Sequence, residues 1–242
     1  MINKYLANSA LSKEPLYHGL KVEVILQPST SDVHLEPCFP QWPMSRDIFH
    51  IVEGEPPLPV GTQLANRITL LPNPATFVLG DLIWGGTPTD AIFHLNSEEA
   101  SKVPSGEKRA DKFGALAGHL LGQRSYYPLY PAFQPAAEGA SPAAPLEVTQ
   151  LWHLGMPCSP DILLLPSKLG VPCCKISGGG TVVINPGYLA RNKTYAKVTL
   201  YPASALPQDS ADDESNFSHT VSAMAPSRVR VDIDKILLDE EA

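Results

Sequence analysis

The stretch PDILLLPSKLGVPCCKISGGGTVVINPGYLARNKTYAKVTLYP, residues 160–202, decides the fold class of this chain. Its apolar residues come in short runs at 162–165, 171–176 and 181–184. Runs of this length, bounded by Pro, Gly or Asn, are typical of buried strands rather than helices. The glycines at 178–180 can supply the positive φ of a tight reversal, and Asn185-Pro186-Gly187 turns the chain out of the last run. We therefore predict three short strands here.

Strand patterns continue on both sides of this stretch. They are predicted at residues 21–27, 68–71, 76–79, 82–84 and 228–233. Gly80-Asp81 is expected to form the hairpin turn between two of them. The last strand alternates polar and apolar residues, which is typical of a strand with one exposed face.

Two helices are predicted between these strands. Thr89-Asp90 can cap a helix over residues 91–96. A second helix is predicted over residues 107–121, with Gly122 as its stop signal. Its apolar face consists of Phe113, Leu116, Leu120 and Leu121. Strands mixed with helices predict the α+β class, and periodicity alone indicates no more than a mixture of α and β.

Two segments have the composition of flexible insertions. The first, about 132–147, begins AFQPAAEGASPAAP and has few bulky apolar residues. The second, about 204–227, includes the polar run SADDESN. We predict that both are surface excursions of one domain, since 242 residues with 43% hydrophobic content can form one sizeable core.

The charge balance limits the range of partners. The net charge is -7, and only 18% of the residues are charged. A broad nucleic-acid surface needs clustered Lys and Arg, so we expect contact with DNA to be weak or indirect. No apolar run approaches the length needed to cross a bilayer, so no membrane partner is expected.

Four blocks of the chain carry a resemblance to a known family. They are VILQPSTSDVHLEPCFPQ (24–41), TFVLGDLIWGGTPTDAIFHLNSEE (76–99), GQRSYYPLYP (122–131) and the strand–loop–strand block that ends in Asn185-Pro186-Gly187. Together, in this order, they resemble the B subunit of DNA polymerase alpha. The family's typical turn is Asn-Pro-Gly-Arg-Leu; here Tyr188 replaces the Arg, and Leu189 is retained.

The resemblance implies a calcineurin-like phosphoesterase fold, with two packed sheets flanked by helices. Family members carry an OB-fold domain and the first phosphoesterase strands ahead of the block at 24–41. The whole chain, residues 1–242, is therefore expected to be the C-terminal portion of an inactivated phosphoesterase-like domain that lacks its N-terminal strands, with no OB-fold domain. A fragment, an incomplete gene model and a split subunit are all compatible with this expectation.

The resemblance also indicates where metal ligands would lie in an active phosphoesterase. Ser29–Asp32, with His34 beyond, stands at the place of a Gly-Asn-His-Asp/Glu motif, and Asn185–Tyr188 stands at the place of Gly-His-x-His. Asp32, His34 and Asn185 are thus candidates for remnants of a two-metal site. In the alternative interpretation Asp32 fixes its loop by bonds to backbone amides, and His34 packs beside Pro37. We expect no catalytic residues, no bound metal and no cofactor.

The aromatic residues of the third block have two interpretations. Tyr126, Tyr127 and Tyr130 could stack on nucleic-acid bases. Because prolines flank them at 128 and 131, they could instead pack against the domain or a partner.

The resemblance implies a non-catalytic accessory or scaffold subunit of DNA polymerase alpha–primase. Such a subunit would bind the C-terminal region of the catalytic polymerase subunit, meet the primase subunits through the complex, and support initiation of DNA replication in the nucleus. One alternative is a metal-dependent phosphoesterase or 3′–5′ exonuclease. Another is a truncated product that does not assemble.

Overall fold

The computed structural model describes residues 23–33, 35–45, 68–100, 111–135, 143–177, 179–202 and 225–236. Within these ranges the strands are β1 (Val24–Leu26), β2 (Ile68–Leu70), β3 (Ala75–Leu79), β4 (Leu82–Gly86), β5 (Ile162–Leu164), β6 (Cys173–Ser177), β7 (Thr181–Asn185), β8 (Thr194–Leu200) and β9 (Val229–Lys235). The helices are α2 (Ala91–Glu98), α3 (Lys112–Gln123), α4 (Leu189–Asn192), α5 (Ala225–Arg228) and the 3₁₀ helix Val148–Leu154. The predicted α+β class is confirmed.

A five-stranded mixed sheet forms the centre of the molecule, in the order β3-β4-β5-β7-β6. Strand β5 runs parallel to both β4 and β7, whereas β3–β4 and β6–β7 are antiparallel pairs. The predicted turns are confirmed by positive φ values of 68° at Gly80, 83° at Gly179 and 123° at Gly180. Positive φ is easily adopted only by glycine, so these residues permit the tight reversals.

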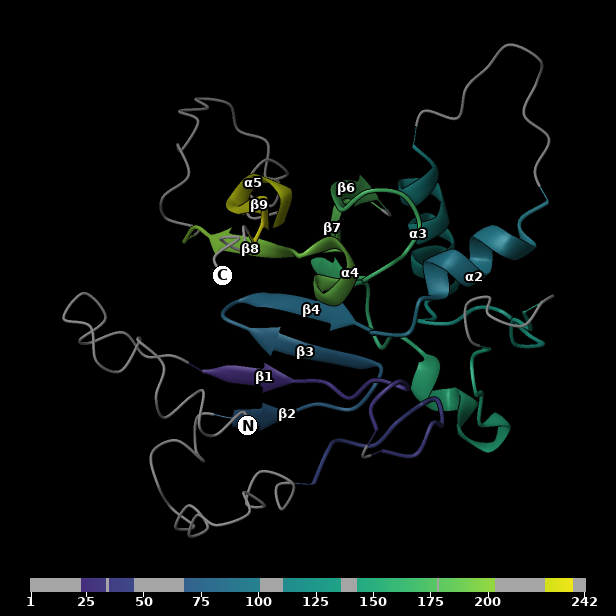
Figure 1. Cartoon of the computed structure of the whole chain (residues 1–242). Coiled ribbons are helices and arrows are strands. Elements are labelled where there is room, and N and C mark those ends of the chain that lie inside the picture. Colours follow the sequence, from purple (N-terminus) through teal and green to yellow (C-terminus); the bar gives the residue numbers. More distant parts are fainter. Residues whose placement is uncertain are drawn as a thin grey trace, which may run out of the picture.

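One face of this sheet is covered by helices. Leu163 of β5 and Val183 of β7 are fully buried and belong to the same cluster as Leu116 and Leu120 of α3. Figure 1 shows α2 and α3 together on the right-hand side of the sheet. The apolar face predicted for the second helix is therefore confirmed as the one that packs on the sheet.

The opposite face is covered by the antiparallel pair β8–β9 (Figure 1). Ile162 and Val182 alternate with the residues of the first face and join a second cluster, against which Val198 and Val231 pack. Successive side chains of a strand point to opposite faces, which explains why β5 and β7 have continuous apolar runs. Strand β8 is not among the strands predicted from the sequence.

Helices α2 and α3 both begin at aspartate caps. Asp90 Oδ1 accepts the Phe93 N–H at 3.0 Å, and Asp111 Oδ1 accepts the Gly114 N–H at 2.9 Å. The cap at Asp90 is confirmed, but α2 extends to Glu98. The stop predicted at Gly122 is wrong, because α3 continues to Gln123 and Arg124 takes the left-handed conformation with φ 49°.

A separate parallel pair, β1–β2, lies at the lower side of the molecule in Figure 1. Its end is tied to the central sheet by Gln27, whose Nε2 donates to the carbonyls of Pro72 at 2.9 Å and Gly86 at 3.0 Å. These bonds hold the loop that follows β1 close to the end of β4.

The flexible insertion predicted at about 132–147 includes residues near both of its ends that are packed in the fold. Phe133 and Ala144 are buried, with 8% and 4% exposure. Residues 136–142 of this segment lie outside the described residues, as do 204–224 of the second predicted insertion; residues 225–227 belong to α5. None of the helices that the structure describes is long and apolar enough to cross a membrane.

Candidate functional site

A small pocket of about 80 Å³ lies between the loop after β1 and the turn after β7. Its walls include Ser29, Thr30, Ser31, Thr89, Asp90, His94, Lys168 and Tyr188. The structure thus brings together two stretches that the sequence places more than a hundred residues apart: the loop that contains Asp32 and the turn that contains Asn185. We refer to this site as the Asp90 pocket.

Asp90 organises the pocket through three hydrogen bonds. Its Oδ1 caps α2, while its Oδ2 accepts the Lys168 N–H at 2.8 Å and lies 3.3 Å from the Tyr188 hydroxyl, which donates to it. A carboxylate that accepts several N–H and O–H groups is strongly held in one orientation. The side chain is 7% exposed, so these protein donors replace water around it.

Tyr188 forms the opposite wall. Its pKa is raised above the ordinary value, first because burial disfavours the phenolate and then because the Asp90 carboxylate lies beside it and accepts its proton in a hydrogen bond. Lys168 Nζ lies 5.8 Å from the centre of the Tyr188 ring. The phenol therefore stays protonated and serves as a hydrogen-bond donor to Asp90.

Asn185, a candidate remnant ligand, is fully buried and does not line the pocket. Its Oδ1 accepts the N–H groups of Ser167 at 3.0 Å and Gly187 at 2.9 Å, and its Nδ2 donates to the Ser167 carbonyl at 3.3 Å. Gly187 has φ 74°, as the predicted turn requires. The Asn185 amide thus holds the turn that places Tyr188 against Asp90.

Asp32 is exposed, and its Oδ2 accepts the Ser29 N–H at 2.8 Å. The Asp32 N–H in turn donates to the Ser29 carbonyl at 3.0 Å. This geometry is the one expected if Asp32 fixes its own loop through backbone amides. His34, the third candidate, lies outside the described residues.

Among the residues that the structure describes, no group of three or more His, Cys, Asp or Glu side chains is placed to hold a metal ion. The polar atoms of Asp90 and Tyr188 bond to each other and to the neighbouring backbone. The chemistry of this arrangement is therefore that of a rigid, internally bonded contact between a helix start, a loop and a turn.

The tyrosines of the third block separate into two groups. Tyr126 and Tyr127 are buried, at 1% and 3% exposure, whereas Tyr130 is 72% exposed. Tyr127 accepts the Phe133 N–H at 3.1 Å and lies 3.1 Å from His94 Nδ1. Packing is thus confirmed for the first two, and they are not accessible to nucleic-acid bases.

Sequence reasoning identified Asp90 only as a helix cap and did not identify Lys168. The local signal, Thr-Asp before an apolar run, indicates that Asp90 caps a helix. It does not indicate the hydrogen-bond partners of Asp90 Oδ2. These partners come from residues 78 and 98 positions away, as the bonds to Lys168 and Tyr188 show.

Comparison with known proteins agrees with the four sequence blocks. The family model described as the B subunit of DNA polymerase alpha/epsilon matches residues 5–171. The DNA polymerase alpha B subunit of Bos taurus is 32% identical over 148 residues, which cover 60% of this chain and 21% of that protein.

Two further relatives carry the same name. The protein of Mus musculus is 29% identical over 171 residues, 70% of this chain and 24% of that protein. The protein of Schizosaccharomyces pombe is 29% identical over 212 residues, 86% of this chain and 33% of that protein. The matches thus span between a fifth and a third of these relatives, and the region matched by the family model includes both Asp32 and Asp90. This chain belongs to the family of DNA polymerase alpha/epsilon B subunits.

Proposed function

We propose that this chain acts as a non-catalytic accessory or scaffold subunit of a DNA polymerase alpha–primase assembly. In this role it binds the C-terminal region of the catalytic subunit, reaches the primase subunits through the complex, and supports initiation of DNA replication in the nucleus. The observation that carries the proposal is the family match over residues 5–171, together with relatives that are all named as B subunits of DNA polymerase alpha.

The Asp90 pocket supports the non-catalytic part of the proposal. Tyr188 stands where the resemblance places a ligand-bearing motif, and its hydroxyl donates to Asp90. Asn185 is committed to backbone bonds. The geometry therefore favours an architectural use of these residues.

The fold is consistent with the expected origin of the domain. We propose that the chain is a portion of a calcineurin-like phosphoesterase domain, with α2 and α3 on one face of the central sheet and β8–β9 on the other. The helices packed on one face of the five-stranded sheet and the second β layer packed on the other support this proposal.

The surface is suited to a protein partner. Val171, Ile176 and Leu189 are 76%, 65% and 56% exposed, and a partner protein would bury this apolar surface. A stable interface of this kind buries on the order of 1,000 Å² or more and resists moderate salt. Contact made mainly with DNA phosphates would instead weaken steeply as salt rises.

Co-expression with the C-terminal region of a DNA polymerase alpha catalytic subunit tests the proposal. We expect the two polypeptides to co-purify at raised salt, with this chain used alone or completed by any upstream part that its gene encodes. If the completed subunit fails to co-purify, while the chain alone binds DNA tightly and in a salt-sensitive manner, the scaffold role is wrong.

A second assay addresses catalysis. We expect no Mn²⁺-stimulated cleavage of single-stranded DNA or of a chromogenic phosphodiester by the purified chain. Turnover that disappears in Asp32→Ala would contradict the non-catalytic role.

A further inference from the structure

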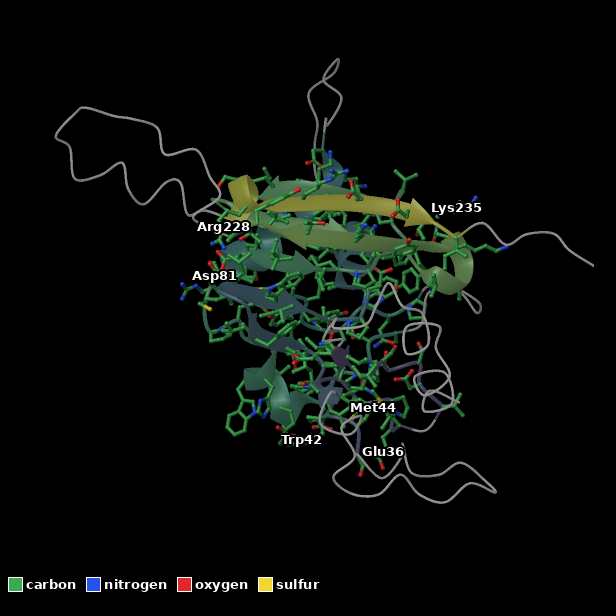
Figure 2. All side chains as sticks on the ribbon, turned by 90° about the vertical axis from the view of Figure 1, so that its left-hand side faces the viewer. Glu36, Trp42, Met44, Asp81, Arg228 and Lys235 are labelled. Carbon is green, nitrogen blue, oxygen red and sulfur yellow. The ribbon has the colours of Figure 1, made fainter. Side chains whose placement is uncertain are left out.

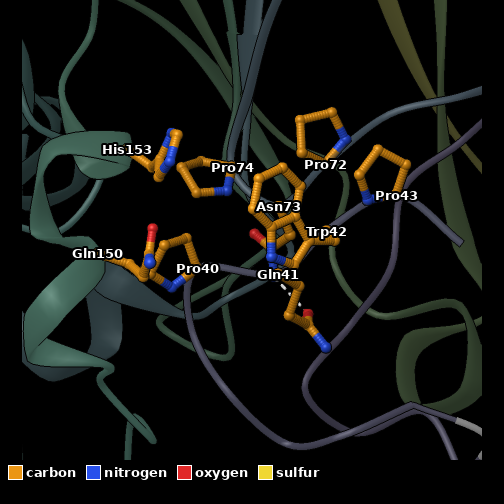
Figure 3. A pocket seen from close by; sticks show the side chains of 9 residues that line it. All are labelled: Pro40, Gln41, Trp42, Pro43, Pro72, Asn73, Pro74, Gln150 and His153. Carbon is orange, nitrogen blue, oxygen red and sulfur yellow. Dashed lines mark hydrogen bonds between the residues drawn. The ribbon is translucent and has the colours of Figure 1, made fainter.

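A second concave site, which shares no lining residue with the Asp90 pocket, lies on the part of the molecule that carries Trp42. Prolines and aromatic rings line this groove of about 280 Å³: Pro40, Pro43, Pro72, Pro74, Trp42 and His153 (Figure 3). Its walls come from the segment before residue 46, the β2–β3 connection and the 3₁₀ helix. We refer to it as the Trp42 groove.

The floor of the groove is fixed by a buried polar pair. The Gln41 and Asn73 backbones exchange N–H···O bonds of 2.7 and 3.0 Å, and Asn73 Nδ2 donates to Gln41 Oε1 at 2.9 Å. Both side chains are buried, at 5% and 0% exposure. The two proline-bearing segments are thus held side by side before any ligand arrives. Little of the binding free energy is therefore spent on ordering the protein.

The rim of the groove presents aromatic surface to solvent. Trp42 is 74% exposed, and its ring contacts the His153 ring edge-on at 5.8 Å. Trp152, outside the lining, is 75% exposed and lies 5.3 Å from His153. Figure 2 shows Trp42 at the lower end of the molecule, on the same side as Glu36. An exposed Trp beside a preformed groove is characteristic of a protein-binding surface.

The charges around the groove select the kind of partner. Residues 35–45, 68–79 and 143–160 contain no Lys or Arg, and their only charged side chains are Glu36 and Glu147, both exposed. The Glu36 carbonyl accepts Gln41 Nε2 at 3.3 Å, and the Glu147 N–H donates to the Phe39 carbonyl at 2.8 Å. These bonds place both glutamates next to the lining residues Gln41 and Pro40.

Among the described residues of these three segments, two carboxylates without a Lys or Arg make a poor site for phosphates, whose binding depends mainly on such cations. The Glu147 carboxylate accepts bonds from the Thr149 hydroxyl at 2.7 Å and the Thr149 N–H at 3.1 Å, which lower the pKa of Glu147 and keep it ionised. The charge pattern therefore favours a ligand that is uncharged where it enters the groove and basic beside it.

We propose that the Trp42 groove binds an extended, proline-containing segment of a partner protein that carries Lys or Arg next to its prolines. Aromatic-lined grooves recognise such segments because the polyproline II conformation is already ordered before binding and presents flat pyrrolidine rings. In this site Trp42 stacks on one of these rings, while Glu36 and Glu147 attract the flanking cation. The proposal goes beyond the scaffold role, since it concerns a different surface and does not depend on which subunit the chain contacts elsewhere.

Fluorescence anisotropy with the full 242-residue chain tests the proposal. The probe is a fluorescein-labelled decaproline peptide with Arg at both ends. We expect saturable binding that Trp42→Ala weakens by about tenfold or more, as for a central aromatic anchor. Trp152→Ala is the matched control: the same residue type with nearly the same exposure, but outside the lining. It should change the affinity by less than about threefold.

Three further probes distinguish the determinants of binding. A Gly-Ser peptide with the same Arg ends should not bind saturably, and decaproline with Glu ends should bind more weakly than the Arg version. Labelled oligo(dT) should bind more weakly than the Arg-decaproline probe. Circular dichroism of Trp42→Ala should match the unsubstituted chain.

The proposal is overturned if the Gly-Ser and proline peptides bind equally, if Trp42→Ala leaves proline binding intact, or if Glu ends bind as well as Arg ends. Tighter binding of oligo(dT), lost in Trp42→Ala, would assign the groove to single-stranded nucleic acid instead. None of these results depends on co-purification with the catalytic subunit, so the two proposals fail separately.

Discussion

The Asp90 pocket and the Trp42 groove are both concave, but they differ in how their side chains are used. In the pocket, Asp90 and Tyr188 bond to each other and to the backbone, and little of Asp90 reaches solvent. In the groove, the bonded pair Gln41 and Asn73 lies at the floor, and Trp42 stands exposed above it. Internally bonded polar groups stabilise the fold, whereas exposed aromatic surface is available to a partner.

This difference separates structural from recognition residues by a measurable criterion. Substitutions around the pocket should cost free energy of unfolding. Substitutions at the groove rim should leave that free energy nearly unchanged and alter binding. The expected loss of unfolding free energy is therefore largest at Asn185, beneath the pocket, and smallest at Trp42, on the groove rim.

Among the substitutions at the two concave sites, Asn185→Ala should have the largest effect, a loss of about 3 kcal/mol. The substitution leaves the buried N–H groups of Ser167 and Gly187 without their acceptor, and each buried unsatisfied group costs roughly 1–3 kcal/mol. Urea denaturation of the full chain measures the change. Asp32→Ala, which removes an exposed acceptor, is the control and should cost about 0.5 kcal/mol or less. Equal losses in the two variants would contradict the structural role of Asn185.

Gly187→Ala should cost about 2 kcal/mol, part from strain and part from crowding. At φ 74° a side chain is disfavoured, and the new Cβ would lie 2.6 Å from Thr194 Oγ1 and 2.8 Å from Pro172 Cγ. Gly80→Ala is a matched control, because Gly80 has φ 68° but no neighbouring atom within 4 Å of an added Cβ. The difference between the thermal midpoints of the two variants measures the crowding alone. A smaller decrease of the thermal midpoint in Gly187→Ala than in Gly80→Ala would mean that the turn at Gly187 is not tightly packed.

The strands of the central sheet were predictable because their signals are local. The runs at 162–165 and 181–184 are short, apolar and bounded by Pro, Asn or Gly, and the structure places β5 and β7 within one residue of them. The end of α3 was not predictable in this way. Arg124 adopts a conformation that usually requires glycine, and its N–H bonds to the Leu120 and Leu121 carbonyls.

The packing of the segment at about 132–147, which depends on a single aromatic residue, was also not predicted. In the segment at about 132–147, composition favours a flexible loop, but Phe133 stacks on His94 with ring centroids 4.6 Å apart. A buried aromatic ring supplies enough apolar contact to hold its neighbours. Composition averages over the segment and therefore misses such an anchor.

The candidate site was predictable only in part, because its bonds are long-range. The resemblance identified the loop at 29–32 and the turn at 185–188 as parts of one region, and both line or support the Asp90 pocket. The bond from the Lys168 N–H to Asp90 joins residues that no local pattern connects. The three-dimensional arrangement alone reveals that Asp90 is the shared acceptor.

Tyr188→Phe should cost about 1 kcal/mol near neutral pH, since it removes one hydrogen bond to a carboxylate at 3.3 Å. It should also change the pH dependence. The pKa of Tyr188 is raised in the folded state, so the unfolded chain loses this proton first as pH rises. The stabilisation is fully present below the ordinary tyrosine pKa of about 10 and is lost as pH increases above it.

Urea denaturation at a series of alkaline pH values measures this effect. The unsubstituted chain should lose stability above a pH of about 10 more steeply than Tyr188→Phe. Burial also raises the pKa values of Tyr126 and Tyr127, so part of the slope remains in the variant. Identical slopes in the two proteins would mean that neither burial nor the Asp90 carboxylate raises the pKa of the Tyr188 phenol in the folded state.

Trp42→Ala should have the smallest effect, about 0.5 kcal/mol or less, although it removes a larger side chain than any of the substitutions around the pocket. Trp42 is 74% exposed, and its ring contact with the His153 ring is edge-on at 5.8 Å, so the substitution uncovers little apolar surface. Thermal denaturation of the full chain measures the change, with Trp84→Ala as the contrast. Trp84 is 6% exposed and stacks with Phe77 at 6.3 Å, so its removal should cost about 3 kcal/mol or more. A comparable loss at Trp42 would mean that its ring is part of the fold's own packing, and the distinction between the two concave sites would then fail.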